Sequence, residues 1–223
     1  MNPDGTERKK LTDNQAYDTS PAYSSNGKEI VFVSQREGEQ SGKVYTMNAE
    51  DGSDQRNLSD STDGKDPAYS PNGERIAIVG QGENEDILVM SAKDGSDEKN
   101  LTNTPPVDGY EVRERDPAYS PDGTRIVFYK ETFRPRDVDL YKLNTKRTGA
   151  KPAIVQITDY SGKEYSPDWL PNGHRIVFYQ DTSAKGLRIF TIRPDGTGES
   201  RVPGTPPENG PSEVLPNWGP KSP

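Results

Sequence analysis

The hydrophobic residues of this chain are concentrated in short runs that recur at regular intervals. Four runs contain almost no polar residue, namely Ile30–Val33, Ile76–Val79, Ile126–Tyr129 and Ile176–Tyr179. A strand with an uninterrupted apolar run is covered on both faces, which in an antiparallel sheet requires a neighbouring layer on each side. The pattern therefore predicts four buried strands, each packed between other sheets.

Each buried strand follows a proline-containing segment that repeats along the chain. The segments read SPAYSSNGKEIVF (20–32), DPAYSPNGERIAI (66–78), DPAYSPDGTRIVF (116–128) and SPDWLPNGHRIVF (166–178). The proline recurs at positions 21, 67, 117, 167 and 216, so successive spacings are 46, 50, 50 and 49 residues. A period of this length is typical of propeller blades rather than of helical repeats.

Within one repeat, hydrophobicity rises from the first strand to the second and then falls toward the fourth. The first strand carries one aromatic residue, the third is mostly apolar, and the fourth has a single apolar anchor such as Leu58 or Leu101. This gradient is typical of a blade that runs from a central channel to a solvated rim. Because no helical period is found, we predict an all-β fold, a β-propeller of four-stranded antiparallel blades.

The repeats give four complete blades and two partial ones. The predicted blades cover residues 19–59, 65–102, 115–159 and 165–203 of a single domain, 1–223. Residues 1–13 match the outer strand of a missing blade, and residues 212–220 match the inner strand of another. We therefore expect an open arc. Its uncovered end blades should cause poor solubility alone or self-association.

Composition and charge exclude several classes of function. The formal net charge is -8 and the chain contains no cysteine. An acidic balance argues against a nucleic-acid partner, and the absence of cysteine removes disulfides and thiolate metal sites. No apolar run approaches the roughly 20 residues of a membrane span, so we expect no membrane insertion.

No arrangement of residues in the sequence indicates catalysis. The chain lacks a Gly-x-Ser-x-Gly elbow, and its single histidine, His174, occupies a turn position where the other repeats have Lys, Glu or Thr. The Asp-Gly turns do not follow the ligand spacing of a calcium-binding hand. We therefore predict a non-enzymatic protein with no catalytic residues, no cofactor and no metal ligands.

Charged residues gather in the loops that a propeller would place on one face. The loops before the first strands and between the second and third strands surround the channel, and this face is the usual binding surface. The candidates there are Asp18, Asp66, Arg113, Arg115, Asp116 and Glu164. One interpretation is an acidic, partly Arg-balanced rim for a basic peptide or a cation. The alternative is that Asp or Ser before proline caps a turn and the other charges are solvated.

Insertions add aromatic residues to the candidates. Residues 103–114 carry Tyr110 close to Arg113, and the loop of the third repeat carries Phe133 and Arg134. A second insertion covers residues 147–153. Exposed aromatic and arginine side chains suit an interaction surface, but tolerated loop drift is the alternative interpretation.

The repeats resemble those of TolB-type propellers, which are distant relatives of WD-repeat blades. The family signature is Pro-x-aromatic-Ser-Pro-Asp-Gly-x-x-Ile-x-Phe, followed by a strand and an Asn-x-Asp-Gly-x-x-x-x-Leu-Thr tail. Residues 115–128 match the core, and residues 48–59 and 92–102 match the tail. Familial TolB usually closes with about six blades and carries a further domain and a signal sequence.

The resemblance implies two different functions. The first is a bacterial, non-enzymatic protein- or peptide-binding module of an envelope system, which would work in the periplasm or elsewhere outside the cytoplasmic membrane. The second is the propeller domain of a larger peptidase or polysaccharide-active enzyme, where it gates or positions substrate. Both remain open from the sequence, because one fold serves many functions.

Overall fold

The computed structural model describes residues 6–36, 41–59, 63–80, 82, 84–134, 136–145, 152–181 and 186–202. These residues form strands, turns and loops without any helix, so none of them belongs to a membrane-spanning helix. Their strands form four separate four-stranded sheets, in which neighbouring strands pair in chain order. The predicted fold is confirmed: the described residues form an all-β propeller of four blades with no closed sheet.

The strands have the following bounds. Blade 1 contains β1 (Tyr17–Tyr23), β2 (Glu29–Gln35), β3 (Lys43–Asn48) and β4 (Arg56–Asn57). Blade 2 contains β5 (Gly64–Tyr69), β6 (Arg75–Gly80), β7 (Asp86–Ser91) and β8 (Lys99–Asn100). Blade 3 contains β9 (Arg113–Tyr119), β10 (Arg125–Phe133), β11 (Arg136–Asn144) and β12 (Ile154–Gln156). Blade 4 contains β13 (Lys163–Trp169), β14 (Ile176–Asp181), β15 (Leu187–Ile192) and β16 (Ser200–Arg201).

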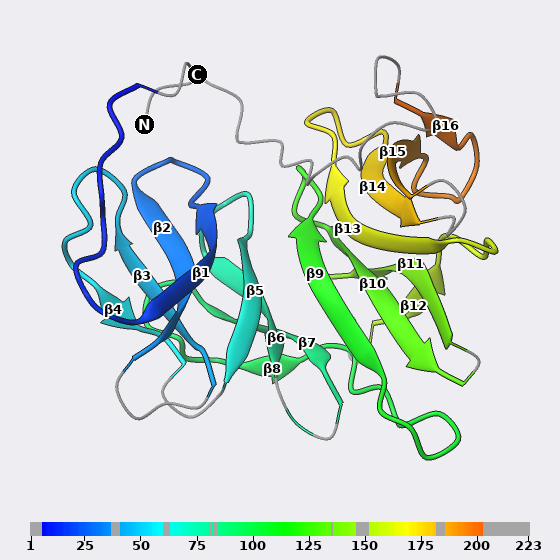
Figure 1. The fold of residues 1–223 in the computed structure, drawn as a ribbon, viewed down its shortest axis with the longest axis horizontal. Helices are drawn as coiled ribbons and strands as arrows, with labels where there is room; N and C mark the ends of the chain where they lie inside the picture. The colour runs from blue at the N-terminus through cyan, green and yellow to red at the C-terminus, as the bar shows by residue number, and fades with distance from the viewer. Residues whose placement is uncertain are drawn as a thin grey trace.

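The blades stand side by side around a common centre (Figure 1). The first strands lie nearest that centre, and the short fourth strands lie at the periphery. Strand β5 contacts both β1 and β9, and β9 contacts β13. The four first strands therefore line one shared space, which we call the channel.

The hydrophobic core lies between the blades. Val31 and Val44 of blade 1 pack against Ile76, Ile78 and Met90 of blade 2, and similar clusters join blade 2 to blade 3 and blade 3 to blade 4. The second strands are buried on both faces, as their apolar runs predict. The fourth strands have only two or three residues, which are exposed or half-buried. The predicted decrease of burial toward the rim is thus confirmed.

The Asp-Gly turn of one blade rests on the tail of the blade before it. A Cβ atom at Gly95 would lie 1.8 Å from the carbonyl oxygen of Leu58, and one at Gly52 would lie 1.9 Å from that of Leu11. Residues 6–16 form no strand, but Leu11 packs on blade 1 in the manner of a tail leucine. Residues 1–5, the predicted inner strand 212–220 and most of the insertion 147–153 lie outside the described residues.

Candidate functional site

Each first strand contains a β-bulge at the residue before its proline. The pairing of the first and second strands shifts there in all four blades. The bulge residues are Ser20, Asp66, Asp116 and Ser166, with φ between 47° and 50°. A bulge accommodates a proline within a strand, and Asp tolerates the left-handed conformation better than most side chains. These residues therefore belong to the channel wall, and the interpretation that they cap turns is wrong.

The four bulge residues neighbour one another around the channel. The Ser20 hydroxyl donates to Asp66 Oδ1 at 3.4 Å, and the Ser166 hydroxyl donates to Asp116 Oδ2 at 2.6 Å. Burial and the adjacent Asp116 carboxylate raise the pKa of Asp66 to about 6. We call Asp66 and Asp116 the channel carboxyl pair. Because like charges that lie close together disfavour ionisation, a cationic group placed between them would be stabilised.

Arg115 serves as an internal ion-pair partner beside the channel carboxyl pair. Its Nη2 donates to Glu85 Oε1 at 3.0 Å, and Lys65 Nζ lies 2.9 Å from the same oxygen. The charges of Arg115 and Lys65 partly offset the rise in the pKa of Asp66. The predicted candidate Arg115 thus connects blade 3 to blade 2. Its partner Glu85 lies at the end of a loop that the sequence assigns to the same face, but no sequence feature singles it out.

The insertion 103–114 contains a hairpin fixed to blade 2. Val107 and Tyr110 exchange two backbone hydrogen bonds around residues 108–109, whose φ values of 52° and 78° are typical of a type I′ turn. The side chain of Asn84 hydrogen-bonds to backbone groups near both ends of the insertion. The hairpin holds Tyr110 at the surface with 37% of its area exposed.

Two aromatic rings of this region stack on two arginines. The Cζ atom of Arg134 lies 4.6 Å from the centre of the Tyr110 ring, and that of Arg113 lies 4.8 Å from the centre of the Phe133 ring. Each distance is within the range of a cation–π interaction. We call these four residues the aromatic–arginine patch. The sequence proposed all four in two separate loops, and the structure brings them into contact.

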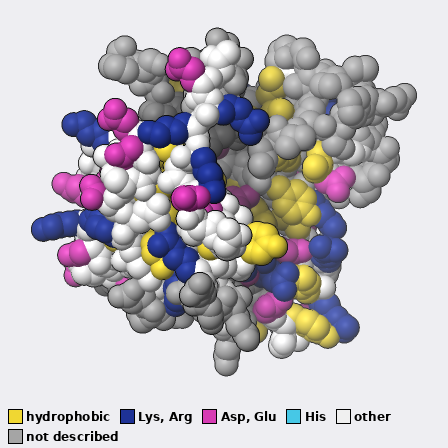
Figure 2. All heavy atoms as spheres, turned by 60° about the vertical axis from the view of Figure 1, so that its left-hand side comes forward, with side chains coloured by type: hydrophobic (Ala, Val, Ile, Leu, Met, Phe, Trp, Pro, Cys, Tyr) yellow, Lys and Arg dark blue, Asp and Glu magenta, His cyan; other side chains and the backbone are white. Residues whose placement is uncertain are grey.

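The patch and the channel carboxyl pair lie on the same side of blade 3. Arg113 pairs with Glu131 in the β9–β10 ladder, and Asp116 follows Arg113 by three residues, or about 10 Å along the strand. Hydrophobic and basic side chains also adjoin each other in the lower right of the surface view in Figure 2. The acidic channel wall therefore lies close to the aromatic–arginine patch, about 10 Å away along β9.

The two remaining candidates, Asp18 and Glu164, precede the bulge of their strands by two residues. Asp18 is half-buried, and its Oδ1 accepts a hydrogen bond from the Ser34 hydroxyl at 2.6 Å. Glu164 is fully buried and accepts a hydrogen bond from Gln180 Nε2 at 3.2 Å. The expectation that Glu164 lies on the rim is wrong, because its side chain enters the interface between blade 3 and blade 4.

A stack of antiparallel four-stranded blades around a channel defines a β-propeller. The chain belongs to the TolB beta propeller domain family, whose model matches residues 1–112. No curated protein matches the sequence.

Solved structures share the fold at low sequence identity. The chain superposes on a protein described as TolB from Agrobacterium tumefaciens with a TM-score of 0.71 and 19% identity, covering 87% of this chain and 65% of that one. For TolB from Acinetobacter baumannii the TM-score is 0.69 and the identity is 18%, and the match covers 89% of this chain and 46% of that one. For oligogalacturonate lyase from Vibrio parahaemolyticus the TM-score is 0.64 and the identity is 14%, and the match covers 86% of this chain and 55% of that one. The chain thus spans less than two thirds of each of these proteins.

Proposed function

We propose that this chain is a non-enzymatic TolB-like propeller module that binds a protein or peptide through its channel face. The observation that carries the proposal is the channel carboxyl pair, Asp66 and Asp116, next to the aromatic–arginine patch. The pair favours a lysine, an arginine or an N-terminal amine, because a cation removes the repulsion between its members. The patch provides rigid aromatic and arginine contacts of the kind that dominate binding energy.

The partner is therefore a peptide segment that combines a basic group with an aromatic or apolar one. The basic group would enter the channel, and the apolar group would lie on Tyr110 or Phe133, about 10 Å away along β9. A spacing of three residues in an extended peptide spans this distance. We propose that this binding occurs outside the cytoplasmic membrane, and the likeness to TolB supports this.

A random peptide library displayed on phage provides a direct test. The immobilised protein should enrich peptides with Lys or Arg close to an aromatic residue. Synthetic copies of these peptides should bind Asp66→Asn/Asp116→Asn and Tyr110→Ala/Arg113→Ala at least about tenfold more weakly than the unaltered protein, which corresponds to about 1.4 kcal/mol.

A variant of the opposite face serves as the control. Lys28→Ala/Lys93→Ala removes two exposed side chains from the turns at the other end of the blades and should leave peptide affinity unchanged. Equal affinity for all four proteins, or no enrichment at all, would contradict the proposal.

A second candidate function follows from the other structural matches. Puromycin hydrolase contains a similar propeller, with a TM-score of 0.64 and 12% identity, and this chain covers 30% of its length. In such an enzyme the same channel face would gate or position substrate for a separate catalytic domain. A hydrolase domain encoded in one reading frame with this chain would favour this function over the first.

A further inference from the structure

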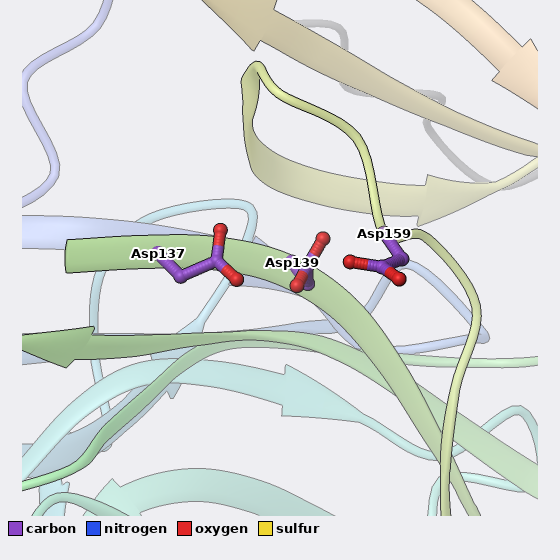
Figure 3. Close-up of side chains that lie close together, drawn as sticks. All are labelled: Asp137, Asp139 and Asp159. Carbon is purple, nitrogen blue, oxygen red and sulfur yellow. The ribbon is translucent and has the colours of Figure 1, made fainter. Parts of the chain in front are cut away.

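Three aspartates meet at the boundary between blade 3 and blade 4. Asp137 and Asp139 are two residues apart on β11 and so share a face, and Asp159 follows β12. One carboxylate oxygen from each lies within 4.8 Å of those of the others. Figure 3 shows the three side chains directed toward a common region, with Asp139 between the other two. Asp139 is buried and Asp159 is exposed, so this aspartate cluster is open to solvent on one side.

A fourth carboxyl group lies next to Asp139 in the interior. Glu164 of β13 is fully buried, and its Oε2 has no hydrogen-bond partner among the residues that the structure describes. The carboxyl groups of Glu164 and Asp139 interact directly. The unpartnered oxygen therefore belongs to a carboxyl group that lies against Asp139, the buried member of the cluster.

The described residues offset these charges only in part. No Lys or Arg among them forms an ion pair with any of the four carboxyls. The neutral groups Gln156 Nε2 and Thr158 Oγ1 donate to Asp139 at 2.8 and 3.3 Å. The Lys130 charge interacts with Asp137 and Asp139, but its Nζ lies 3.9 Å from the centre of the Tyr141 ring and forms no ion pair with either aspartate. Carboxylates that lie this close together repel one another, and one of them is buried, so a bound cation would stabilise this site.

The interface between blades 2 and 3 shows which of the four carboxyl groups recur in the repeat and which do not. Asp86 and Glu114 correspond there to Asp139 and Glu164, whereas Asn84 and Asn103 correspond to Asp137 and Asp159. Glu114 is also buried with an unpartnered Oε2. The buried pair therefore recurs in both interfaces, while Asp137 and Asp159 replace the two asparagines of the interface between blades 2 and 3.

We propose that Asp137, Asp139 and Asp159 bind a calcium ion at the boundary of blade 3 with blade 4, next to the buried carboxyl group of Glu164. Carboxylate oxygens are the ligands of hard divalent cations. Calcium–oxygen distances of about 2.3–2.6 Å place two ligands at most about 5 Å apart, which the 4.8 Å cluster satisfies. Calcium accepts six to eight ligands in irregular geometry, and water can complete its shell on the open side, whereas magnesium requires a smaller octahedron.

The test uses calcium chloride with the whole chain, by isothermal titration and thermal unfolding. We expect one calcium ion per chain and a rise in Tm of about 5 °C or more when calcium exceeds its Kd a hundredfold. The variant Asp137→Asn/Asp159→Asn should fold, because it copies the amides found between blades 2 and 3. It should bind calcium at least about tenfold more weakly and lose the rise in Tm.

A charge-matched control separates specific binding from screening. Asp54→Asn/Asp97→Asn changes two exposed aspartates whose positive φ values Asn also tolerates, and it should retain the whole calcium effect. The proposal is overturned if about 10 mM calcium leaves Tm unchanged, since this concentration exceeds the Kd of even weak calcium sites in proteins. It is equally overturned if the cluster variant keeps the full calcium effect, or if magnesium acts as strongly as calcium.

Discussion

At the scale of single residues, the bulge position distinguishes the blades from one another. Blades 1 and 4 have serine there, and blades 2 and 3 have Asp66 and Asp116. Both residue types occupy the same left-handed conformation, so the backbone alone does not explain the choice of aspartate. Two adjacent carboxyls destabilise the fold at neutral pH, and such a cost is typical of binding sites.

Replacing Asp66 by Asn should stabilise the protein at neutral pH. The folded-state pKa of about 6 exceeds the ordinary 3.8, so the folded chain binds more protons than the unfolded chain between these values. The free energy of unfolding therefore falls as pH rises through that window. We expect Asp66→Asn to gain about 1–3 kcal/mol at pH 7 and almost nothing below pH 4, measured by urea unfolding. Asp54→Asn, at an exposed position, should change neither value.

Replacing Gly95 by Ala should destabilise the protein more than replacing Gly27. Both glycines have positive φ, of 73° and 69°, so both substitutions strain the backbone by about 1–2 kcal/mol. Only at Gly95 would the new Cβ atom also collide with the carbonyl of Leu58, whereas at Gly27 nothing lies within 4 Å. We expect Gly95→Ala to lower the free energy of unfolding by at least about 1 kcal/mol more. Equal losses would show that the contact between turn and tail is unimportant.

At the scale of strands and blades, the fold can be predicted from the sequence because the same pattern occurs four times. Runs such as Ile76–Val79 are recognisable as buried strands without any knowledge of their neighbours. The burial of Glu164 could not be predicted in this way, because no local sequence feature distinguishes a side chain that enters an interface from one that lies on the rim. The aspartate cluster also escapes sequence analysis, since Asp139 and Asp159 are joined only by the packing of β11 and the segment after β12.

The contribution of the first-strand aromatic residue to stability should depend on how far the preceding blade buries it. Trp169 packs against blade 3 and is 3% exposed, whereas Tyr23 is 56% exposed. We expect Trp169→Ala to lower the free energy of unfolding by about 3–5 kcal/mol, and Tyr23→Ala by less than about 1 kcal/mol. Urea titrations of the two variants test this. Losses of similar size would mean that the order of the blades differs from the one described here.

At the scale of the whole molecule, one face combines an acidic channel with an aromatic surface, while the net charge is -8. The aromatic contacts are insensitive to salt, but attraction between the channel carboxyl pair and a basic peptide is screened. We expect a library-selected basic peptide to bind several-fold more weakly at about 1 M than at about 0.1 M ionic strength. The Asp66→Asn/Asp116→Asn variant should show a much smaller change. The same salt dependence in both proteins would place the attraction elsewhere.

The titration of Asp66 itself, followed by carboxyl-carbon NMR, tests most directly whether stacked blades create the channel carboxyl pair. Asp66 and Asp116 lie 50 residues apart in the sequence, so only this arrangement of the blades brings them together. We predict a pKa of about 6 for Asp66 and a clear decrease toward its ordinary value in Asp116→Asn. A pKa near 4 that does not respond to Asp116→Asn would contradict both the pair and the function proposed for it.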